Sequence, residues 1–322
     1  MELFKNKKIL IIGDVMIDSY LFGNVERISP EAPVPIVDII VKQDKLGGAA
    51  NVASNILNLG GTPILCSTIG KDQKGELFLS IIKKLKMSTK YICQSNNRIT
   101  TTKTRIIGNN HQMLRIDEEI KNTINNNEEE NLLSMINEAI INENIDSILF
   151  QDYDKGVLNK NIIHKTINIA KSYNIPVIVD PKKINFLEYK NSTLFKPNYK
   201  EFKEGLNLYG NNRIEILEKG SKILHNNGIK IIFVTLSENG IYISYKDKKN
   251  IISKIIPGIP RDVVDVSGAG DTVASVASML INDINIEEIA KISNIAGGLV
   301  CEEIGVVPID RKKLLKEYKK LK

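Results

Sequence analysis

The sequence contains no tryptophan, and its 322 residues include only three cysteines and three histidines. Cys66, Cys93 and Cys301 are far apart and form no C-x-x-C pair, which argues against a disulfide framework or a structural zinc site. No apolar run approaches the ~20 residues that cross a bilayer, and the first residues lack the apolar core of a signal peptide. We therefore expect a reduced, cytoplasmic protein that does not bind membranes.

The sequence also lacks a large excess of either charge, since its 44 basic and 38 acidic residues leave a formal net charge of only +6. The basic residues form no dense block and are not interleaved with aromatic residues, so the sequence predicts no nucleic-acid partner. The mild positive excess suits phosphorylated substrates without being specific for them. The frequent Ile, Lys and Asn residues suggest a compositional habit without a mechanism.

Several nucleotide and hydrolase motifs are also missing. The sequence has no G-x-x-x-x-G-K-[ST], which excludes a Walker A loop. Gly268-Ala269-Gly270 lacks the third glycine of a dinucleotide fingerprint, and no βαβ unit with a ribose-binding acid follows it, so a dehydrogenase is not expected. The absence of G-x-S-x-G and of a plausible Cys–His pair removes the commonest acyl-transfer sites.

One stretch that is present, residues 262–272, organises the rest of the chain. A β-favouring run with Val263, Val264 and Val266 leads into Ser267-Gly-Ala-Gly, then Asp271, then a helical pattern of small residues to about residue 280. Glycines and a helix N-terminus together make an anion site. An acid there repels a phosphate unless it has a chemical task, such as deprotonating an attacking hydroxyl. The alternative is a first-turn helix cap.

Strand-like and helix-like segments alternate along almost the whole chain. This pattern predicts an α/β fold with a doubly wound, mostly parallel sheet and helices on both faces, in a single domain of residues 1–322. The expected strands include residues 8–13, 63–69, 146–150, 176–180, 193–195 and 229–235, and a hairpin of 241–245 with 251–256. The expected helices are residues 49–59, 75–86, 132–141, 161–172, 215–226, 269–280, 286–303 and 311–321.

Two β-rich segments do not fit this alternation. Residues 34–41 follow a proline-rich stretch, and residues 99–107 and 111–117 resemble a hairpin with basic residues on one face. We expect them to form a small β-lid, contributed by about residues 15–45 and 97–118. Lys103, Arg105 and Arg115 on the hairpin could meet a substrate phosphate or form a solvated face.

Acids and amides follow several expected strands, where open α/β sheets bind their ligands. They are Asp14, Asp18, Gly47, Gly48, Asn51 in the second turn of its helix, Asp152, Asn198 and Glu201. Together with Asp271 they favour phosphoryl transfer, in which a carboxylate deprotonates an alcohol while amides and Mg²⁺ hold the phosphate. For Asp14 alone, a capped turn is the other interpretation.

These residues carry a family resemblance. Gly13-Asp14, Gly47-Gly48-Ala-Ala-Asn51 and Asp265-Val-Ser-Gly-Ala-Gly-Asp271 resemble the signatures of the ribokinase (PfkB) family of sugar kinases. Within it, residues 13–18, 27–35, 152–156, 180–182 and 197–198 are similar to the D-glycero-β-D-manno-heptose-7-phosphate kinases. Those enzymes make heptose 1,7-bisphosphate for the ADP-heptose of surface polysaccharide, such as lipopolysaccharide. Another sugar, sugar phosphate or nucleoside, or binding without catalysis, are the alternatives.

The resemblance implies a role for each matching residue. Asp271 would be the base, with Gly268, Ala269 and Gly270 as the anion hole. The sugar phosphate would be bound by Asp14, Asp18, Gly47, Gly48, Asn51, Lys103, Arg105, Asp152 and Lys155. ATP would be bound by Asn198, Glu201, Thr235, Ser237, Gly240 and Ser267, with Glu201 serving Mg²⁺ indirectly; a K⁺ requirement stays open. The lid would form a homodimer interface, and a separate nucleotidyltransferase would be needed, because the chain has no H-x-G-H.

Three positions depart from the family pattern. Gln151 stands where relatives usually have a small residue, Lys183 replaces a glycine and Lys196 replaces a small polar residue. We expect all three to flank the pocket, where they bear on which sugar is bound.

Overall fold

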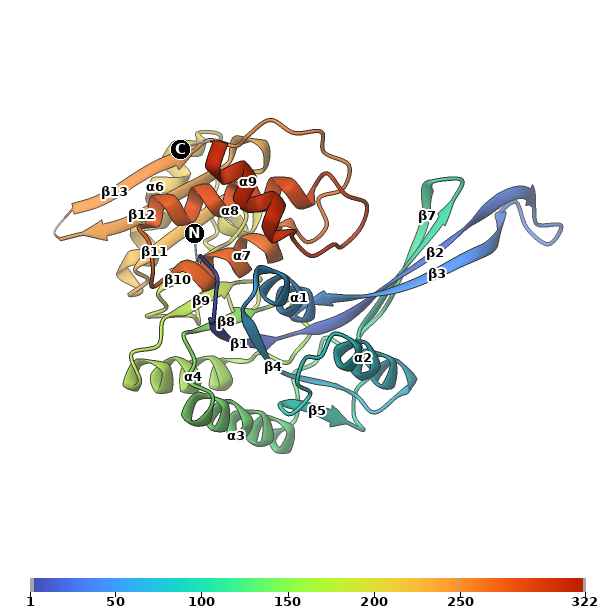
Figure 1. Ribbon diagram of the computed structural model, residues 1–322, viewed down its shortest axis with the longest axis horizontal. Coiled ribbons are helices and arrows are strands. Elements are labelled where there is room, and N and C mark those ends of the chain that lie inside the picture. Colours follow the sequence, from blue (N-terminus) through green and yellow to red (C-terminus); the bar gives the residue numbers. More distant parts are fainter. Residues whose placement is uncertain (1–2, 249, 321–322) are drawn as a thin grey trace.

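The computed structural model describes residues 3–248 and 250–320 (Figure 1). Its main sheet consists of β1 (Lys8–Gly13), β4 (Thr62–Gly70), β5 (Ile92–Ser95), β8 (Ser147–Gln151), β9 (Val177–Asp180), β10 (Leu194–Phe195), β11 (Ile231–Thr235), β12 (Ile241–Asp247) and β13 (Asn250–Ile256). In the described residues their order is β13-β12-β11-β10-β9-β8-β1-β4-β5. Neighbours from β5 to β11 pair in parallel, and β12 and β13 add an antiparallel hairpin at one edge. The predicted doubly wound, mostly parallel sheet is confirmed.

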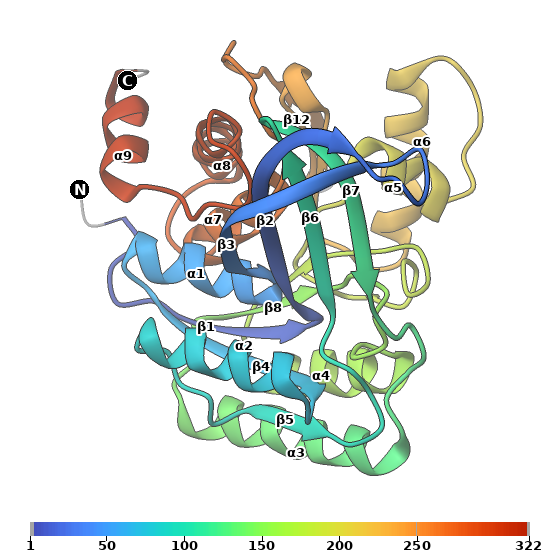
Figure 2. The same cartoon turned by 90° about the vertical axis from the view of Figure 1, so that its right-hand side faces the viewer.

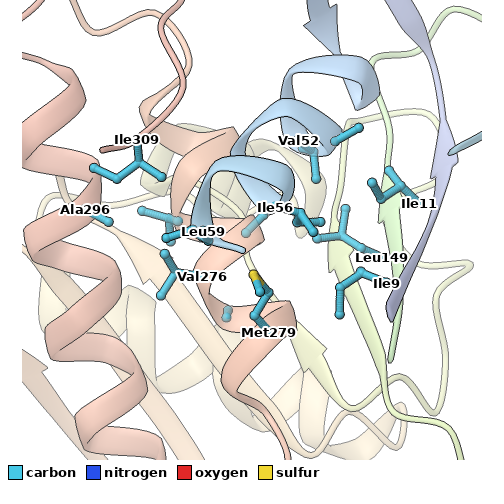
Figure 3. Packing of buried hydrophobic residues seen from close by; sticks show 14 of the residues in the cluster. Ile9, Ile11, Val52, Ile56, Leu59, Leu149, Val276, Met279, Ala296 and Ile309 are labelled. Atoms are coloured by element: carbon cyan, nitrogen blue, oxygen red, sulfur yellow. The ribbon is translucent and has the colours of Figure 1, made fainter. Parts of the chain in front are cut away.

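Helices cover both faces of this sheet. They are α1 (Ala49–Leu59), α2 (Gln73–Lys84), α3 (Asn126–Asn142), α4 (Lys160–Ser172), α5 (Tyr199–Gly205), α6 (Arg213–Asn226), α7 (Ala269–Leu280), α8 (Ile286–Val300), α9 (Arg311–Lys320) and the short 3₁₀ helix η1 (Ser237–Asn239). One apolar core joins the sheet to α1, α7 and α8, and a second joins its other face to α3, α4 and α6. In Figure 3, Val52 and Ile56 of α1 lie close to Ile9, Ile11 and Leu149 of the sheet.

The central strand β1 shows why the sequence folds this way. Its residues Ile9 to Ile12 are all fully buried, because helices cover both faces of the strand. A continuous apolar run is therefore stable here, whereas an edge strand exposed on one face would alternate. The run ends at Gly13, and the polar residues that follow emerge at the carboxyl end of the sheet.

A second sheet leaves the body at this same end. It consists of β2 (Val15–Ile28), β3 (Pro35–Gly48), β6 (Thr102–Gly108) and β7 (His111–Glu118), in the order β3-β2-β6-β7. Figures 1 and 2 show it as a curved arm that projects from the main body. Only Asp14 separates β1 from β2, and β3 runs directly into α1. The base of this arm, which we call the lid sheet, is therefore tied to the carboxyl end of β1.

Some local predictions were wrong. Residues 262–266 form no strand: Val263, Val264 and Val266 are each more than half exposed, and the amide N–H groups of Val264 and Asp265 bond the carbonyl of Cys301. Asn51 lies in the first turn of α1, because the helix begins at Ala49. In addition, α3 starts earlier than expected, since Asn125 and Glu128 form a capping box at its N-terminus.

Across the described ranges, no helix is both long and apolar enough to span a membrane.

Candidate active site

The N-terminus of α7 places Asp271 at the centre of the candidate site. Gly268 precedes the helix with φ 83°, a left-handed conformation that favours glycine, and it contributes no side-chain cap. Ser267, Gly268, Ala269 and Gly270 thus lead into a helix N-terminus whose amides and dipole favour an anion. Asp271 is the third residue of the helix and is buried.

Three donors from two distant parts of the chain hold the Asp271 carboxylate. Asn51 of α1 donates from Nδ2 to Oδ2 at 2.7 Å. Gln151, the last residue of β8, donates from Nε2 to Oδ1 at 3.0 Å, and the Tyr153 hydroxyl donates to the same oxygen at 2.7 Å. Residues distant in sequence therefore converge on a single acid.

Burial raises the pKa of Asp271 to about 6, and the charge of Asp180 adds to this effect. Hydrogen bonds from Asn51 and Tyr153, and the charge of Lys196, act in the opposite direction. A general base works best when its pKa lies near the working pH. A buried carboxyl group with this pKa could therefore act as a general base near neutral pH, whereas a solvent-exposed helix cap would show no such rise.

A second buried acid connects this carboxylate to a lysine. Gln151 donates its other amide hydrogen to Oδ2 of Asp180 at 3.1 Å, and Lys196 Nζ lies 3.0 Å from Oδ1 of Asp180. A Cβ atom placed on Gly270 would lie 3.4 Å from the same Nζ. The buried ammonium of Lys196 therefore lies beside the N-terminus of α7 and adds positive charge to the anion site.

Asp14 organises the loop that carries Tyr153. Its carboxylate accepts hydrogen bonds from the backbone N–H groups of Tyr153, Lys155 and Val157 at 2.8–3.1 Å. Burial, together with the charge of Asp152, raises the pKa of Asp14 to about 6. Protein groups thus occupy this carboxylate, and its contact with a sugar remains a prediction.

Other protein groups also occupy the carboxylate of Asp152. Its carboxylate accepts hydrogen bonds from Tyr189 at 2.7 Å, from Asn185 at 3.1 Å and from the amide of Asp154 at 2.9 Å. The residue is buried, so its expected part in sugar binding remains a prediction as well.

The end of β3 brings the glycine pair next to the lid. Gly48 has φ 58° and precedes α1, and the Ala49 amide donates to the carbonyl of Asp14 at 2.9 Å. A Cβ atom on Gly47 would lie 2.1 Å from Oδ2 of Asp18. Only glycine fits at this approach of lid sheet and helix.

The basic residues predicted to meet a phosphate are paired with acids in this structure. Arg105 donates to Asp18 at 2.6 Å, Lys155 lies 2.9 Å from Glu119, and Lys103 contacts Asp117 and Glu119. A phosphate would have to compete with these carboxylates, so the role of the three cations remains a prediction.

Five of the six residues assigned to ATP lie at neighbouring strand ends, whereas the sixth, Ser267, directly precedes the N-cap of α7. Asn198 and Glu201 form the capping box of α5, and Glu201 is also paired with Lys182. Thr235 ends β11 and bridges to Asn198, followed by Ser237 in η1 and by Gly240 with φ 91°. All five thus surround one region of the sheet edge.

No group of three or more His, Cys, Asp or Glu side chains among the described residues could hold a metal ion. Mg²⁺ in phosphoryl-transfer enzymes usually keeps several waters and takes only one or two protein carboxylates beside the nucleotide phosphates. Glu201 would fit such an indirect role, because its carboxylate lies at the N-terminus of α5, beside the ammonium of Lys182.

Sequence reasoning missed Tyr153, Asp180 and Lys182 as members of the site. Asp180 could have been found from its place after an apolar run, as Asp14 was. Tyr153 gave no such signal, because a tyrosine in a polar loop is common. Of the three departures from the family pattern, Gln151 and Lys196 lie in the buried network, whereas Lys183 is exposed.

Comparison with known sequences identifies the family of this chain. The pattern of the pfkB family carbohydrate kinases matches residues 6–312. The chain is 38% identical over 304 residues to the bifunctional protein HldE of Aliarcobacter butzleri, covering 94% of this chain and 62% of that protein. It is 37% identical over 301 residues to the HldE of Helicobacter pylori strain HPAG1, covering 93% and 64%. The chain thus spans less than two thirds of these relatives.

Solved structures show the same fold at lower identity. Phosphofructokinase-2 from Escherichia coli in complex with potassium superposes with a TM-score of 0.79 at 19% identity, covering 98% of this chain and 99% of that one. The Arabidopsis thaliana ribokinase complexed with ribose and ATP gives a TM-score of 0.73 at 19% identity, with the same coverage.

Proposed function

Because this chain belongs to the pfkB family of carbohydrate kinases and is an ATP-dependent sugar kinase, we propose that its acceptor is D-glycero-β-D-manno-heptose 7-phosphate. The anomeric hydroxyl would be phosphorylated to give the 1,7-bisphosphate, a precursor of ADP-heptose. The observation that carries the catalytic part is Asp271, a carboxyl group tuned by burial at an uncapped helix N-terminus. An acid without a chemical task would weaken a phosphate site at this position.

In the proposed reaction, Asp271 accepts the proton of the acceptor hydroxyl. The acceptor oxygen forms a bond to the γ-phosphorus of ATP, the bond from that phosphorus to the bridging oxygen breaks, and ADP leaves. The amides of Gly268, Ala269 and Gly270 would face the charge on the transferring group, with the ammonium of Lys196 beside them. In this structure the Ala269 amide donates to the carbonyl of Val266 at 3.3 Å, so it would have to exchange that bond for the phosphate. Asn51 orients the base through its 2.7 Å hydrogen bond.

On the nucleotide side, Asn198, Thr235, Ser237 and Gly240 would bind ATP. Glu201 would hold Mg²⁺ through water, and the ion would neutralise charge on the phosphates. The ion pair with Glu201 also places the ammonium of Lys182 beside this carboxylate, where it could be attracted to the phosphates of ATP. A requirement for K⁺ belongs to the same proposal and remains open.

Support for the heptose comes from residues 13–18, 27–35 and 152–156, which resemble heptose-7-phosphate kinases, and from the identity with the HldE proteins. Asp18, Lys103, Arg105 and Lys155 would meet the distal part of the acceptor from the lid side. Release of Lys103 and Lys155 from Glu119 would free two cations for the 7-phosphate. A separate nucleotidyltransferase activity would then use the product.

A kinase for a different sugar is the second candidate. Gln151 and Lys196 both lie within hydrogen-bonding reach of Asp180, at 3.1 and 3.0 Å. The family resemblance implies small residues at these two positions. This change beside the base favours a different acceptor. A protein that binds without catalysis is disfavoured by the donors gathered on Asp271.

A panel of acceptors with Mg-ATP tests the proposal. We expect fastest turnover with the heptose 7-phosphate and a product phosphorylated at the anomeric carbon. Faster turnover with fructose 6-phosphate or ribose would replace the first candidate with the second. Asp271→Asn should lower kcat by ~10³-fold or more with little change in ATP binding, while the surface variant Asp283→Asn retains activity.

A further inference from the structure

One oxygen of the proposed base, Oδ1 of Asp271, already accepts two hydrogen bonds and so has both of its lone pairs in use. Oδ2 is bonded by Asn51, and Oδ1 is bonded by both Gln151 and Tyr153. A general base must accept a hydrogen bond of about 2.6–3.2 Å from the hydroxyl that it deprotonates. An acceptor hydroxyl that approaches Oδ1 therefore has to replace one of the donors already bonded there.

Two of the three donors to Asp271 are held in place by other contacts. The amide of Gln151 also donates to Asp180 at 3.1 Å, and it is buried. Asn51 lies in the first turn of the buried helix α1, where its Oδ1 accepts a hydrogen bond from Asn55 at 3.4 Å. Moving either would break a buried network, which is costly because the remaining polar groups lose their partners.

Tyr153 is the donor that can leave. It is half-buried, and among the described residues the structure gives its hydroxyl one hydrogen-bond partner, Asp271. Its ring also lies 5.3 Å from Nζ of Lys182, a cation–π contact that other positions of Lys182 would release. The bond it makes, a neutral hydroxyl to Oδ1 at 2.7 Å, is the bond that an acceptor hydroxyl would make.

The backbone around Tyr153 is fixed. The amides of Tyr153, Lys155 and Val157 donate to Asp14, and the amide of Asp152 donates to the carbonyl of Asp180 at 3.0 Å. Departure of the hydroxyl therefore needs rotation of the side chain and no movement of the loop.

We propose that Tyr153 is a gate on the base: its hydroxyl occupies the acceptor's position on Asp271 in the unliganded protein and swings away when the sugar hydroxyl binds. This inference rests on the proposed function in requiring a hydroxyl acceptor, but not on which sugar carries it. The gate keeps the base oriented and shielded until an acceptor replaces the phenol. An acceptor hydroxyl must therefore replace the phenol before it can bond Oδ1 of Asp271.

The charged and polar groups around Asp271 make the gate detectable in the pH dependence of the reaction rate. Asp271 is faced by Asn51 from α1, by Gln151 and Tyr153 from β8 and its loop, by Asp180 from the end of β9, and by Lys182 and Lys196. The Tyr153 bond lowers the pKa of Asp271. Removing the hydroxyl should raise this pKa in the free protein, but not in the complex, where Tyr153 has already left.

Tyr153→Phe tests this with one atom removed. The acid limb of kcat/KM for the acceptor reports the free protein, and that of kcat reports the complex. We expect the first limb to move up by ~0.5–1 pH unit, the second to stay, and the acceptor KM to fall by ~3–10-fold. Asn51→Ala, which removes a donor that stays, should move both limbs.

A shift of both limbs in Tyr153→Phe would overturn the gate, because the hydroxyl would then remain on Asp271 during the reaction. No shift in either limb would overturn it as well. Thermal unfolding of each variant confirms that the fold is retained.

A second measurement needs no turnover. The chain has no tryptophan, so tyrosines dominate its near-ultraviolet absorption, and a phenol bonded to a carboxylate absorbs differently from a free one. Titrating the unliganded protein across pH 6 should give a tyrosine difference signal that Tyr153→Phe and Asp271→Asn both lack. Adding the sugar that the panel identifies, with a non-hydrolysable ATP analogue, should remove it.

The outcomes separate the two proposals. A working kinase without the tyrosine signal refutes the gate and leaves the proposed function intact. A signal in the unliganded protein with no sugar phosphorylated refutes the proposed function, and the gate fails too when no sugar of the panel removes the signal.

Discussion

At the scale of single residues, two carboxyl groups with the same pKa have different tasks. Burial raises the pKa of both Asp14 and Asp271 to about 6. Asp14 accepts three backbone N–H groups and holds a loop. Asp271 accepts side-chain donors instead, and one of them, the Tyr153 hydroxyl, can be exchanged for an acceptor. Perturbed pKa values therefore mark the site, but only the identity of the donors tells the base from the loop anchor.

The pKa of Asp271 predicts how activity depends on pH. The base must be ionised, so kcat/KM should fall as the pH drops through about 6. Both folded pKa values lie above the ordinary 3.8, so the stability from protonating these two groups is present below pH 3.8 and lost as the pH rises through about 6.

The two groups therefore do not destabilise the fold in the window where activity is lost. Rates and thermal unfolding measured from pH 7.5 to 5 check this expectation. A melting temperature that falls in parallel with the rate would show that unfolding, not protonation of the base, causes the loss.

Lys196 is expected to matter for stability because its partner Asp180 is buried. The two side chains are 3% and 7% exposed and lie 3.0 Å apart. Lys196→Met leaves Asp180 as an unpaired buried charge and should lower the free energy of unfolding by ~3–5 kcal/mol. Urea denaturation measures the change.

The matched control is Lys200→Met. Lys200 pairs with Glu204 on the surface of α5 at 3.9 Å and is 82% exposed, so the loss should stay within about 0.5 kcal/mol. Equal losses for the two variants would contradict the buried-pair argument.

At the scale of elements, several asparagines cap helices, a role that the amino-acid composition did not reveal. Asn125, Asn159, Asn198, Asn212 and Asn285 each cap the N-terminus of a helix by accepting a backbone N–H. A cap of this kind stabilises a helix by about 1 kcal/mol. These five asparagines therefore have a structural role, while the interpretation of the overall asparagine frequency as a compositional habit stays untested.

The loop of residues 152–157 depends on one glycine. Gly156 has φ 83°, and a Cβ atom there would lie 2.0 Å from the carbonyl oxygen of Asn122. Gly156→Ala should lower the free energy of unfolding by about 2–4 kcal/mol and also reduce kcat, because the backbone that carries Tyr153 must shift. Denaturation and steady-state rates measure the two effects.

Gly210→Ala is the control for Gly156→Ala, because it introduces the backbone strain of a positive φ without a steric clash. Gly210 has φ 136° with open space around it, since the nearest atom to an added Cβ is Ile216 Cδ1 at 3.8 Å. We expect a loss of about 1–2 kcal/mol and no change in kcat. A similar fall in kcat for both variants would argue against a specific role of the loop.

At the scale of the whole molecule, the lid sheet exposes apolar side chains far from the body. Ile28 is 70% exposed, Ile40 67% and Leu114 54%, and both outer strands, β3 and β7, are sheet edges. A surface of this kind is typical of a protein–protein interface. We predict that the chain forms a homodimer through the lid sheet.

The variant Ile40→Asp/Leu114→Asp tests this dimer. It should be a monomer in light scattering after size exclusion, with an unchanged circular dichroism spectrum. Ile184→Asp is the control, because Ile184 is equally exposed at 70% but lies outside the lid sheet. A monomeric wild type, or dissociation by the control alone, would refute the prediction.

The sequence by itself determined the fold class and its order of elements, because burial on both sides of a parallel sheet demands continuous apolar strands such as β1. It also placed Asp271 at a helix N-terminus, because glycine and helix signals are local. The sequence did not show that residues 262–266 form no strand, because β propensity alone does not reveal that the segment has no neighbouring strand to pair with.

Only the tertiary structure decided what surrounds Asp271. Asn51 is 220 residues away from Asp271, Gln151 is 120 and Tyr153 is 118, so no local pattern joins them. The pKa of Asp271 likewise follows from burial, which depends on how α7 packs against α1 and the sheet. The raised pKa of Asp271 and the hydrogen bonds to its carboxylate both arise from long-range packing, which a linear sequence does not display.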